Sequence, residues 1–326
     1  MDRRHATAVL AALLGFPSLL RAQRHAGPVI GFLESGSPAA FVDRLAAFRK
    51  GLGENGYVEG RNLTIEHRWA EGRYERLPEF AADLVKRGVS VIAATGSPNT
   101  ARAAQAATKV IPIVFANGGD PVKLGLVPSL SHPGGNATGV SFFNSTLLAK
   151  RIELVRQLLP KAKVAAIIVN PNNPNTPADL KELQDAAKSF GLQALILNAT
   201  DAGELESVFH QAAQNHSDAI LVHNDAYFST LTKQFAGLAT RSGIPTIYYL
   251  REFVMAGGLL SYGTNIVDMY REAGIYVAKI LKGAKPGELP ILFPTKFEFI
   301  VNLKTAKALN VVIPQSILVR ADEVIE

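Results

Sequence analysis

The regular alternation of short apolar segments with longer segments of helical spacing constrains the fold of this chain more than any other feature. Residues 29–33, 91–94 and 164–169 are apolar and partly β-branched, which is typical of strands buried on both faces of a parallel sheet. The segments between such strands place apolar residues three and four positions apart, as an amphipathic helix requires. This order predicts an α/β protein with helices on both faces of a parallel sheet.

The alternating pattern occurs twice along the 326 residues, which are enough for two domains of ordinary size. The elements after residue 263 are too few to form a third core, so we expect them to add to the first two. We therefore predict two Rossmann-like parallel-sheet lobes joined by a multi-strand hinge near Phe142, Gly263 and Leu289. The predicted division is residues 27–142 plus 264–288 for lobe 1, and residues 143–263 plus 289–326 for lobe 2.

Residues 1–22 have the features of an export signal peptide. Two arginines, Arg3 and Arg4, precede a short apolar run, and Ala22 offers a small residue at the cleavage point. The arginine pair leaves general and twin-arginine export both open. The sequence contains no cysteine, which excludes disulfides, a cysteine metal site and a lipid-anchored cysteine. No later segment is apolar over a length that spans a bilayer, so we expect a soluble, exported protein in the periplasm.

Charge and motif searches exclude several classes of function. The net charge of +6 comes from scattered lysines and arginines, without the clustered basic patch that nucleic-acid binding needs. A nucleophile elbow, a phosphate-binding loop, a zinc-protease motif and a dinucleotide-binding glycine pattern are all missing. The seven histidines are dispersed, and His223 fits a residue at the end of a strand better than a metal ligand. We expect no cofactor, no metal and no catalytic residue.

The turn at Thr95, Gly96 and Ser97 is the strongest candidate for a ligand contact. It follows a buried strand, and Ser97 with Pro98 then begins an alanine-rich helix. The start of a helix has free N–H groups and a partial positive charge, which together attract anions. The turn therefore predicts one wall of a cleft that binds a carboxylate, although an ordinary capped turn is the alternative.

Other candidate ligand residues follow the remaining strands, because parallel α/β sheets bind ligands at the carboxyl ends of their strands. Asp225 is the candidate for an ammonium group, with a helix N-cap as the alternative role. For Arg251, the alternatives to a ligand contact are a pair with Glu252 and a place on the rim of the lobe. The complete predicted set is Ser35, Ser37, Thr95, Gly96, Ser97, Asn117 and Asp120 on lobe 1, and Asn170, Asn224, Asp225, Tyr227, Arg251 and Tyr262 on lobe 2.

Several motifs resemble one known family. They are Gly-Tyr-Val-Glu-Gly-Arg-Asn-Leu at 56–63, Ala-Thr-Gly-Ser-Pro at 94–98, Pro-Gly-Gly-Asn-Ala-Thr-Gly at 133–139 and Pro-Thr-Lys-Phe-Glu at 294–298. The chain resembles the substrate-binding proteins of ABC transporters, in their tryptophan/tyrosine-type branch, over nearly its whole length. The resemblance implies the type I periplasmic-binding fold and a receptor that closes on a small ligand and delivers it to a membrane permease.

The resemblance and the strand-end residues together predict a monomeric receptor for a carboxylate-bearing ligand, first an aromatic or branched amino acid. Two alternatives remain open at this point. One is an exported two-lobed enzyme that acts on a small polar or sugar substrate. The other is a ligand-sensing receptor for a membrane signalling partner.

Overall fold

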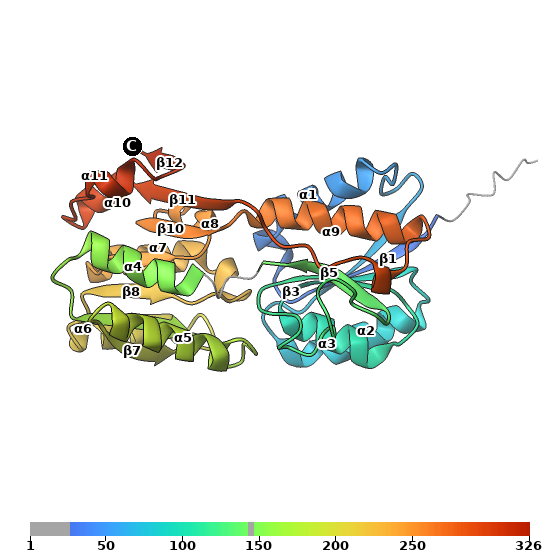
Figure 1. Cartoon of the computed structure of the whole chain (residues 1–326), viewed down its shortest axis with the longest axis horizontal. Coiled ribbons are helices and arrows are strands. Elements are labelled where there is room, and N and C mark those ends of the chain that lie inside the picture. The colour runs from blue at the N-terminus through green and yellow to red at the C-terminus, as the bar shows by residue number, and fades with distance from the viewer. Residues whose placement is uncertain (1–26, 143–146) are drawn as a thin grey trace, which may run out of the picture.

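Two sheets organise the chain into two α/β lobes that lie side by side (Figure 1). The structure, a computed structural model, describes residues 27–142 and 147–326. The predicted export signal at residues 1–22 lies outside the described part of the chain. The sheet of lobe 1 is entirely parallel and has the order β2-β1-β3-β4-β5. Its strands are β1 (Val29–Glu34), β2 (Thr64–Trp69), β3 (Val91–Gly96), β4 (Ile113–Asn117) and β5 (Ala137–Ser141).

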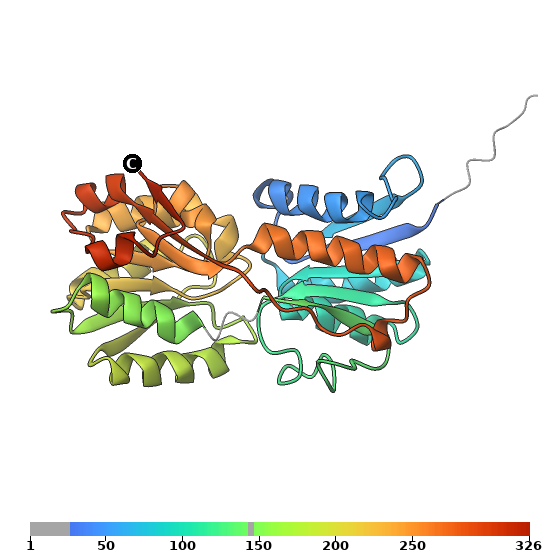
Figure 2. The same cartoon turned by 45° about the horizontal axis from the view of Figure 1, so that its top comes forward.

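Helices cover both faces of this sheet, as the alternation predicts. They are α1 (Val42–Gly53), α2 (Leu77–Lys86), α3 (Pro98–Ala107) and α9 (Ile266–Leu281). Helices α1 and α9 pack on one face and α2 and α3 on the other, each pair over its own apolar core (Figure 2). The α1 and α9 backbones touch at glycines, since a Cβ on Gly51 would lie 2.0 Å from the Arg271 carbonyl oxygen. A late segment of the chain thus completes the first lobe.

Lobe 2 contains a seven-stranded sheet with the order β12-β11-β10-β9-β8-β6-β7. Its strands are β6 (Val164–Val169), β7 (Gln193–Asn198), β8 (Ala219–Val222), β9 (Thr246–Tyr248), β10 (Leu260–Thr264), β11 (Phe297–Asn302) and β12 (Glu323–Ile325). Its helices are α4 (Leu148–Leu158), α5 (Thr176–Ser189), α6 (Leu205–Gln214), α7 (Thr232–Ser242), α8 (Arg251–Met255), α10 (Leu303–Ala308) and α11 (Gln315–Leu318). Apolar cores lie on both faces of this sheet as well, which confirms the predicted fold class.

Two local predictions are wrong. The sequence after Pro121 predicts a short helix, but residues 121–125 form turns, and Gly125 at φ +70° ends them before a helix can develop. The alternation of polar and apolar residues at 296–302 predicts an edge strand, but β12 pairs with the outer side of β11. Strand β11 itself runs antiparallel to β10. The short C-terminal strand has no clear period of its own, so only the neighbouring strand reveals it.

The chain crosses from one lobe to the other after β5, after β10 and after α9. Thr264 Oγ1 donates to the Phe142 carbonyl oxygen at 3.2 Å, which joins the first two of these passages. Leu292, placed in lobe 2 by the sequence division, exchanges backbone hydrogen bonds with Gly139 and Ser141 of β5 at 3.0 and 2.9 Å. The last passage therefore lies beyond Leu292. Residues 143–146, at the start of predicted lobe 2, lie outside the described chain.

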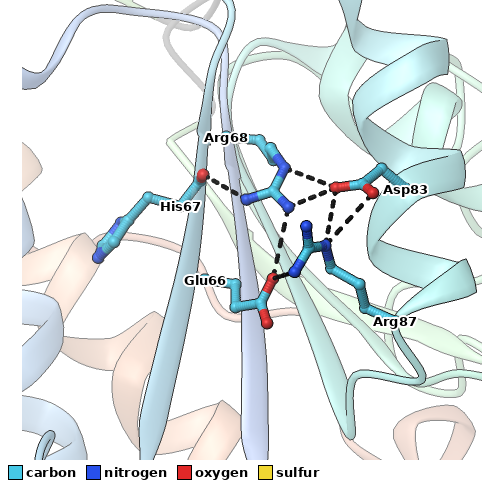
Figure 3. A network of polar contacts seen from close by, with 5 residues as sticks. All are labelled: Glu66, His67, Arg68, Asp83 and Arg87. Atoms are coloured by element: carbon cyan, nitrogen blue, oxygen red, sulfur yellow. Dashed lines mark hydrogen bonds and ion pairs between the residues drawn. The ribbon is translucent and has the colours of Figure 1, made fainter.

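Charged side chains protect the free edge of lobe 1 (Figure 3). Edge strand β2 carries Glu66 and Arg68, and both bond to charged residues of α2 and the turn after it. Arg68 Nε donates to Asp83 Oδ2 at 2.9 Å, and Arg87 Nη1 lies 3.3 Å from Glu66 Oε2. Charges along an edge strand oppose pairing with another chain, so this network keeps the edge of the sheet unextended.

Candidate functional site

A cavity of about 50 Å³ lies between the lobes, where the carboxyl ends of both sheets meet. Turn residues after β3 and β4 line it from lobe 1, and loops after β6, β8 and β9 line it from lobe 2. The lining residues of lobe 1 are Arg44, Gly96, Ser97, Pro98, Gly118, Gly119, Phe142 and Ile266 at the start of α9. Those of lobe 2 are Asn173, Asn175, Asp179, Asn224, Asp225, Ala226, Ser229, Tyr249 and Leu250. The turns at 95–97 and 224–227 thus border the same cavity.

The turn after β3 presents the N-terminus of α3 to the cavity. Ser97 caps this helix, since its Oγ accepts a hydrogen bond from the Asn99 backbone N–H at 3.2 Å. Gly96 has φ +90°, and a Cβ there would lie 2.0 Å from Glu34 Oε1, so this position requires glycine. A hydroxyl and a helix N-terminus at one wall form an environment that stabilises an anion.

Arg44 adds a cation to this wall and was not among the predicted residues. Its side chain extends from α1 into the cavity and stacks on Phe41, with 4.4 Å from the guanidinium carbon to the ring centroid. Nη1 donates to Ser229 Oγ of lobe 2 at 3.2 Å, and Nη2 lies 3.6 Å from Glu252 Oε1. Burial opposes the charge, but nearby acidic groups, Glu252 first, raise the pKa of Arg44 overall. The residue is therefore a buried cation that contacts both lobes.

Two predicted hydroxyls contact a buried glutamate instead of the cavity. Thr95 Oγ1 donates to Glu34 Oε2 at 2.5 Å, and Ser35 Oγ donates to Glu34 Oε1 at 3.1 Å. Tyr270 of α9 also donates to Oε2, at 2.9 Å. Burial raises the pKa of Glu34 despite these donors. Thr95 and Ser35 therefore fix the loop below the cavity and do not line it.

Asp225 is the central polar group of lobe 2. Its Oδ1 accepts from Asn170 Nδ2 at 3.2 Å and from the Tyr227 and Phe228 backbone N–H groups at 3.0 and 3.1 Å. Its Oδ2 accepts from Asn173 Nδ2 at 3.1 Å. Burial raises the pKa of Asp225, and these hydrogen bonds oppose that shift. The carboxyl group therefore caps its own loop and also borders the cavity, and its role in binding an ammonium group stays a prediction.

Behind Asp225 lie two further buried groups. His223 Nε2 is 2.9 Å from Asp179 Oδ2, and Asp179 lines the cavity. Arg151 of α4 donates through Nη1 to Asn224 Oδ1 at 2.8 Å. Burial lowers the pKa of Arg151 to about 9, so its guanidinium remains charged at neutral pH.

Several predicted residues lie elsewhere. Asp120 accepts from the backbone N–H groups of Val122 and Lys123 and holds a surface turn. Arg251 pairs with Glu298 and Glu323 at 3.3 and 2.9 Å, because its short helix faces β11 and β12.

Tyr262 packs against Phe299 in a separate pocket of lobe 2, since alternate residues of β10 face opposite sides of the sheet. Ser37 begins a surface turn and, like Asn170, is not part of the cavity lining.

Asn117 ends β4 next to the cavity residue Gly118. Its side chain is fully buried, and neither amide atom has a hydrogen-bond partner among the described residues. A buried amide without partners is costly, so a ligand group or a water is expected there. Its role as a ligand residue stays a prediction.

The lobes are closed on each other across the cavity. Tyr74 Oη donates to Asp225 Oδ2 at 3.3 Å, and Asn175 Nδ2 donates to the Gly118 carbonyl oxygen at 3.1 Å. Tyr227 lies against Gly72, where a Cβ would approach its ring to 2.4 Å. About 50 Å³ holds only a few waters. The contacts between the lobes must break before the cleft can widen.

Several residues that line the cavity were not predicted from the sequence. The loop after β6 contains four asparagines, and this signal could have indicated Asn173 and Asn175 besides Asn170. Tyr249 directly follows β9 and could have been selected by the strand-end rule. Arg44 and Ser229 carry no local signal, because their positions in the cavity depend on how the lobes meet. Within residues 27–142 and 147–326, three or more histidine or acidic side chains nowhere gather in a way that could hold a metal ion. No helix in the same part of the chain has the length and apolar character of a membrane span.

Comparisons with known proteins agree with this architecture. A family model described as ABC transporter substrate binding protein matches residues 29–325. A tyrosine-binding protein of Clostridioides difficile is 30% identical over 263 residues, which cover 81% of this chain and 75% of that protein.

Two solved structures have the same arrangement of lobes. An ABC domain from Streptococcus pneumoniae in complex with L-Trp has a TM-score of 0.84 and 26% identity, covering 92% of this chain and 100% of that one. A conserved domain protein from Vibrio cholerae has a TM-score of 0.85 and 26% identity, covering 91% and 99%.

Proposed function

The chain belongs to the ABC transporter substrate-binding protein family, and we propose from this that it binds an aromatic L-amino acid between its lobes. The tyrosine-binding relative and the L-Trp complex support this ligand class. The family consists of binding proteins, so the exported enzyme considered from the sequence is the weaker alternative.

One observation carries the proposal: the cavity offers opposite charges from its two lobes. Ser97, the N-terminus of α3 and Arg44 form an anion-binding wall on lobe 1, and Asp225 with Asp179 forms an acidic wall on lobe 2. An α-amino acid carries a carboxylate and an ammonium group a few ångströms apart, and it complements both walls. Hydrogen bonds to such charged groups contribute roughly 1.5–3 kcal/mol each.

The apolar part of the lining fits the aromatic side chain. Phe142, Ile266, Tyr249 and Leu250 border the cavity beside the charged groups. An aromatic ring packed against such rings gains roughly 0.5–1.5 kcal/mol beyond the burial of its area. Asn117, whose amide atoms have no described partner, supplies a further polar contact near the anion-binding wall.

Titration calorimetry with the mature protein tests the ligand class. We expect L-Trp or L-Tyr to bind, and tryptamine, which lacks the carboxylate, to bind at least a hundredfold more weakly. S97A is expected to weaken L-Trp binding at least tenfold, while loss of the α3 N-cap lowers fold stability by roughly 0.5–2 kcal/mol. Equal binding of tryptamine and L-Trp would refute the carboxylate site, and unchanged binding by S97A would reduce Ser97 to a helix cap.

The transport role is part of the same proposal. The receptor is exported to the periplasm by the signal at residues 1–22, acts as a monomer, and delivers its ligand to an ABC permease in the inner membrane. Reconstitution with the permease in proteoliposomes tests delivery, because transport should require the loaded receptor. Transfer of a ligand signal without uptake would instead favour the sensing receptor.

A further inference from the structure

Arg151 is a buried cation in lobe 2 that no ion pair explains. Its side chain is fully buried, and no carboxylate of the described chain lies within ion-pair distance of it. Nε donates to the Tyr262 carbonyl oxygen at 2.8 Å, and Nη1 donates to Asn224 Oδ1 at 2.8 Å. Nη2 has no hydrogen-bond partner in the part of the chain that the structure describes. A buried charge of this kind is costly unless some other group compensates it.

The contact with Arg151 determines how the amide of Asn224 is oriented. A guanidinium has only donors, so the atom of Asn224 that faces it must be the oxygen. The NH₂ group, Nδ2, is left on the other side, and Asn224 lines the cavity. No described residue accepts a hydrogen bond from Nδ2, and the backbone oxygen of Asn224 is already bonded to Asn173 Nδ2 at 2.8 Å. Asn224 Nδ2 is therefore a hydrogen-bond donor that lobe 2 holds at the cavity.

This donor changes the expected arrangement of the ligand. Asp225 and Asp179 give lobe 2 an acidic character, which by itself would attract only the ammonium group. Asn224 Nδ2 instead offers a donor that is suited to an oxygen acceptor, and the positive charge of Arg151 lies directly behind it. A carboxylate that reaches this point is bound by lobe 1 and lobe 2 together, so it links ligand binding to closure of the lobes.

We propose that Arg151 is a positioning residue that holds Asn224 with its amide NH₂ toward the cleft, as a donor from lobe 2 to the ligand's carboxylate. The inference rests on the proposed function, because it takes the ligand to be an amino acid. It adds a role for a residue that does not touch the ligand itself. If Arg151 were purely structural, it would only hold α4 to β10 through the Tyr262 carbonyl oxygen. The orientation of Asn224 would then have no effect on ligand binding.

Calorimetry with L-Trp on a set of variants separates these roles. R151M removes the charge and the donors at similar size, and we expect at least tenfold weaker binding, partly restored in R151K. N224A should lose as much as R151M, and the double variant should lose no more than N224A within a factor of two. R156M is the control, since Arg156 lies on the same helix and donates to the backbone carbonyls of Pro160, Ala162 and Phe190 outside the cavity. Losses that multiply in the double variant would overturn the proposal.

N224D tests the donor while Arg151 remains intact, so it gives an answer even if R151M does not fold. Aspartate keeps an oxygen toward Arg151 and places a second oxygen where the NH₂ group was. We expect L-Trp binding to fall at least tenfold with no loss of thermal stability. Binding as tight as that of the unmodified protein would show that the ligand presents a donor there, and the proposal would be wrong.

The failure of the proposed function would be recognised separately. If the unmodified protein binds neither L-Trp nor L-Tyr, the ligand class is wrong, whatever the role of Arg151. The positioning contact is then examined in the free protein by NMR of the arginine side chains. We expect slow hydrogen exchange at Arg151 Nη1 that N224A abolishes and R156M leaves unchanged. Fast exchange in the unmodified protein would overturn the contact itself.

Discussion

Arg44 is expected to control closure of the lobes, and R44M is the most direct perturbation of it. The guanidinium reaches from α1 of lobe 1 to two groups of lobe 2, Ser229 and Glu252. Methionine keeps the apolar part of the side chain against Phe41 but removes the charge and the donors. The free energy of closing should therefore become less favourable, and ligand affinity should fall with it, because the ligand is held by both lobes.

The magnitude follows from the two contacts. The hydrogen bond from Nη1 to Ser229 Oγ at 3.2 Å has a charged donor, so it contributes roughly 1.5–3 kcal/mol. The ion pair with Glu252 is longer, at 3.6 Å, and Glu252 is 32% exposed, so it adds about 0–1 kcal/mol. A total of about 1.5–4 kcal/mol corresponds to roughly 10- to 700-fold weaker binding, since 1.4 kcal/mol is a factor of ten.

Closure can be followed directly because the chain has no cysteine. Exposed Lys86 of α2 and Lys188 of α5 lie on different lobes, and K86C with K188C gives a labelled pair for energy transfer between them. We expect R44M to shift the pair toward the open distance and to need roughly 10- to 700-fold more L-Trp for closure. R49M is the matched control, since Arg49 lies on the same helix and pairs with Glu59 within lobe 1. Closure of R44M at the same L-Trp concentration as R49M would refute the reasoning.

Two other predictions concern buried hydroxyl and carboxyl groups. Y74F removes the hydrogen bond of 3.3 Å to Asp225 across the lobes, so calorimetry should show three- to tenfold weaker L-Trp binding, a loss of roughly 1 kcal/mol. The control Y276F loses a hydrogen bond within lobe 1 and should bind L-Trp normally. Equal effects of the two variants would contradict the prediction. Burial raises the pKa of Glu34 above its usual 4.5, so the folded state binds a proton more tightly than the unfolded state. The protonated carboxyl group therefore stabilises the fold at low pH, and this stabilisation is lost as pH rises through the raised pKa. Chemical denaturation from pH 4 to 8 should show this loss in the unmodified protein and not in E34Q, and parallel curves would disprove it.

Much of the fold follows from short-range patterns in the sequence. The strands at 91–96 and 164–169 are apolar throughout, which only a sheet covered on both faces accommodates. Helix α3 was predicted from Ser97 and Pro98, which are preferred at the start of a helix for reasons confined to one turn of backbone. The C-terminal strand at 323–325 was missed, because three residues are too few to show a period.

The sequence alone determined two α/β lobes with largely parallel sheets and the location of a cavity at their strand ends, because both depend on the order of the elements. Ser97, Asn224 and Asp225 could be predicted for that reason. Only the tertiary structure decided which strand-end side chains reach the cavity. Thr95 bonds to Glu34 of the neighbouring strand, while Arg44 enters the cavity from a helix.

The physical reason is the distance along the chain over which each contact forms. A hydrogen bond such as that of Arg44 with Ser229 joins residues 185 positions apart, and it exists only after both lobes have folded and met. The same holds for Arg151 and Asn224, 73 positions apart, whose contact sets the direction of an amide in the cleft. Local patterns determine the elements, and the packing of distant elements determines which polar atoms remain free for a ligand.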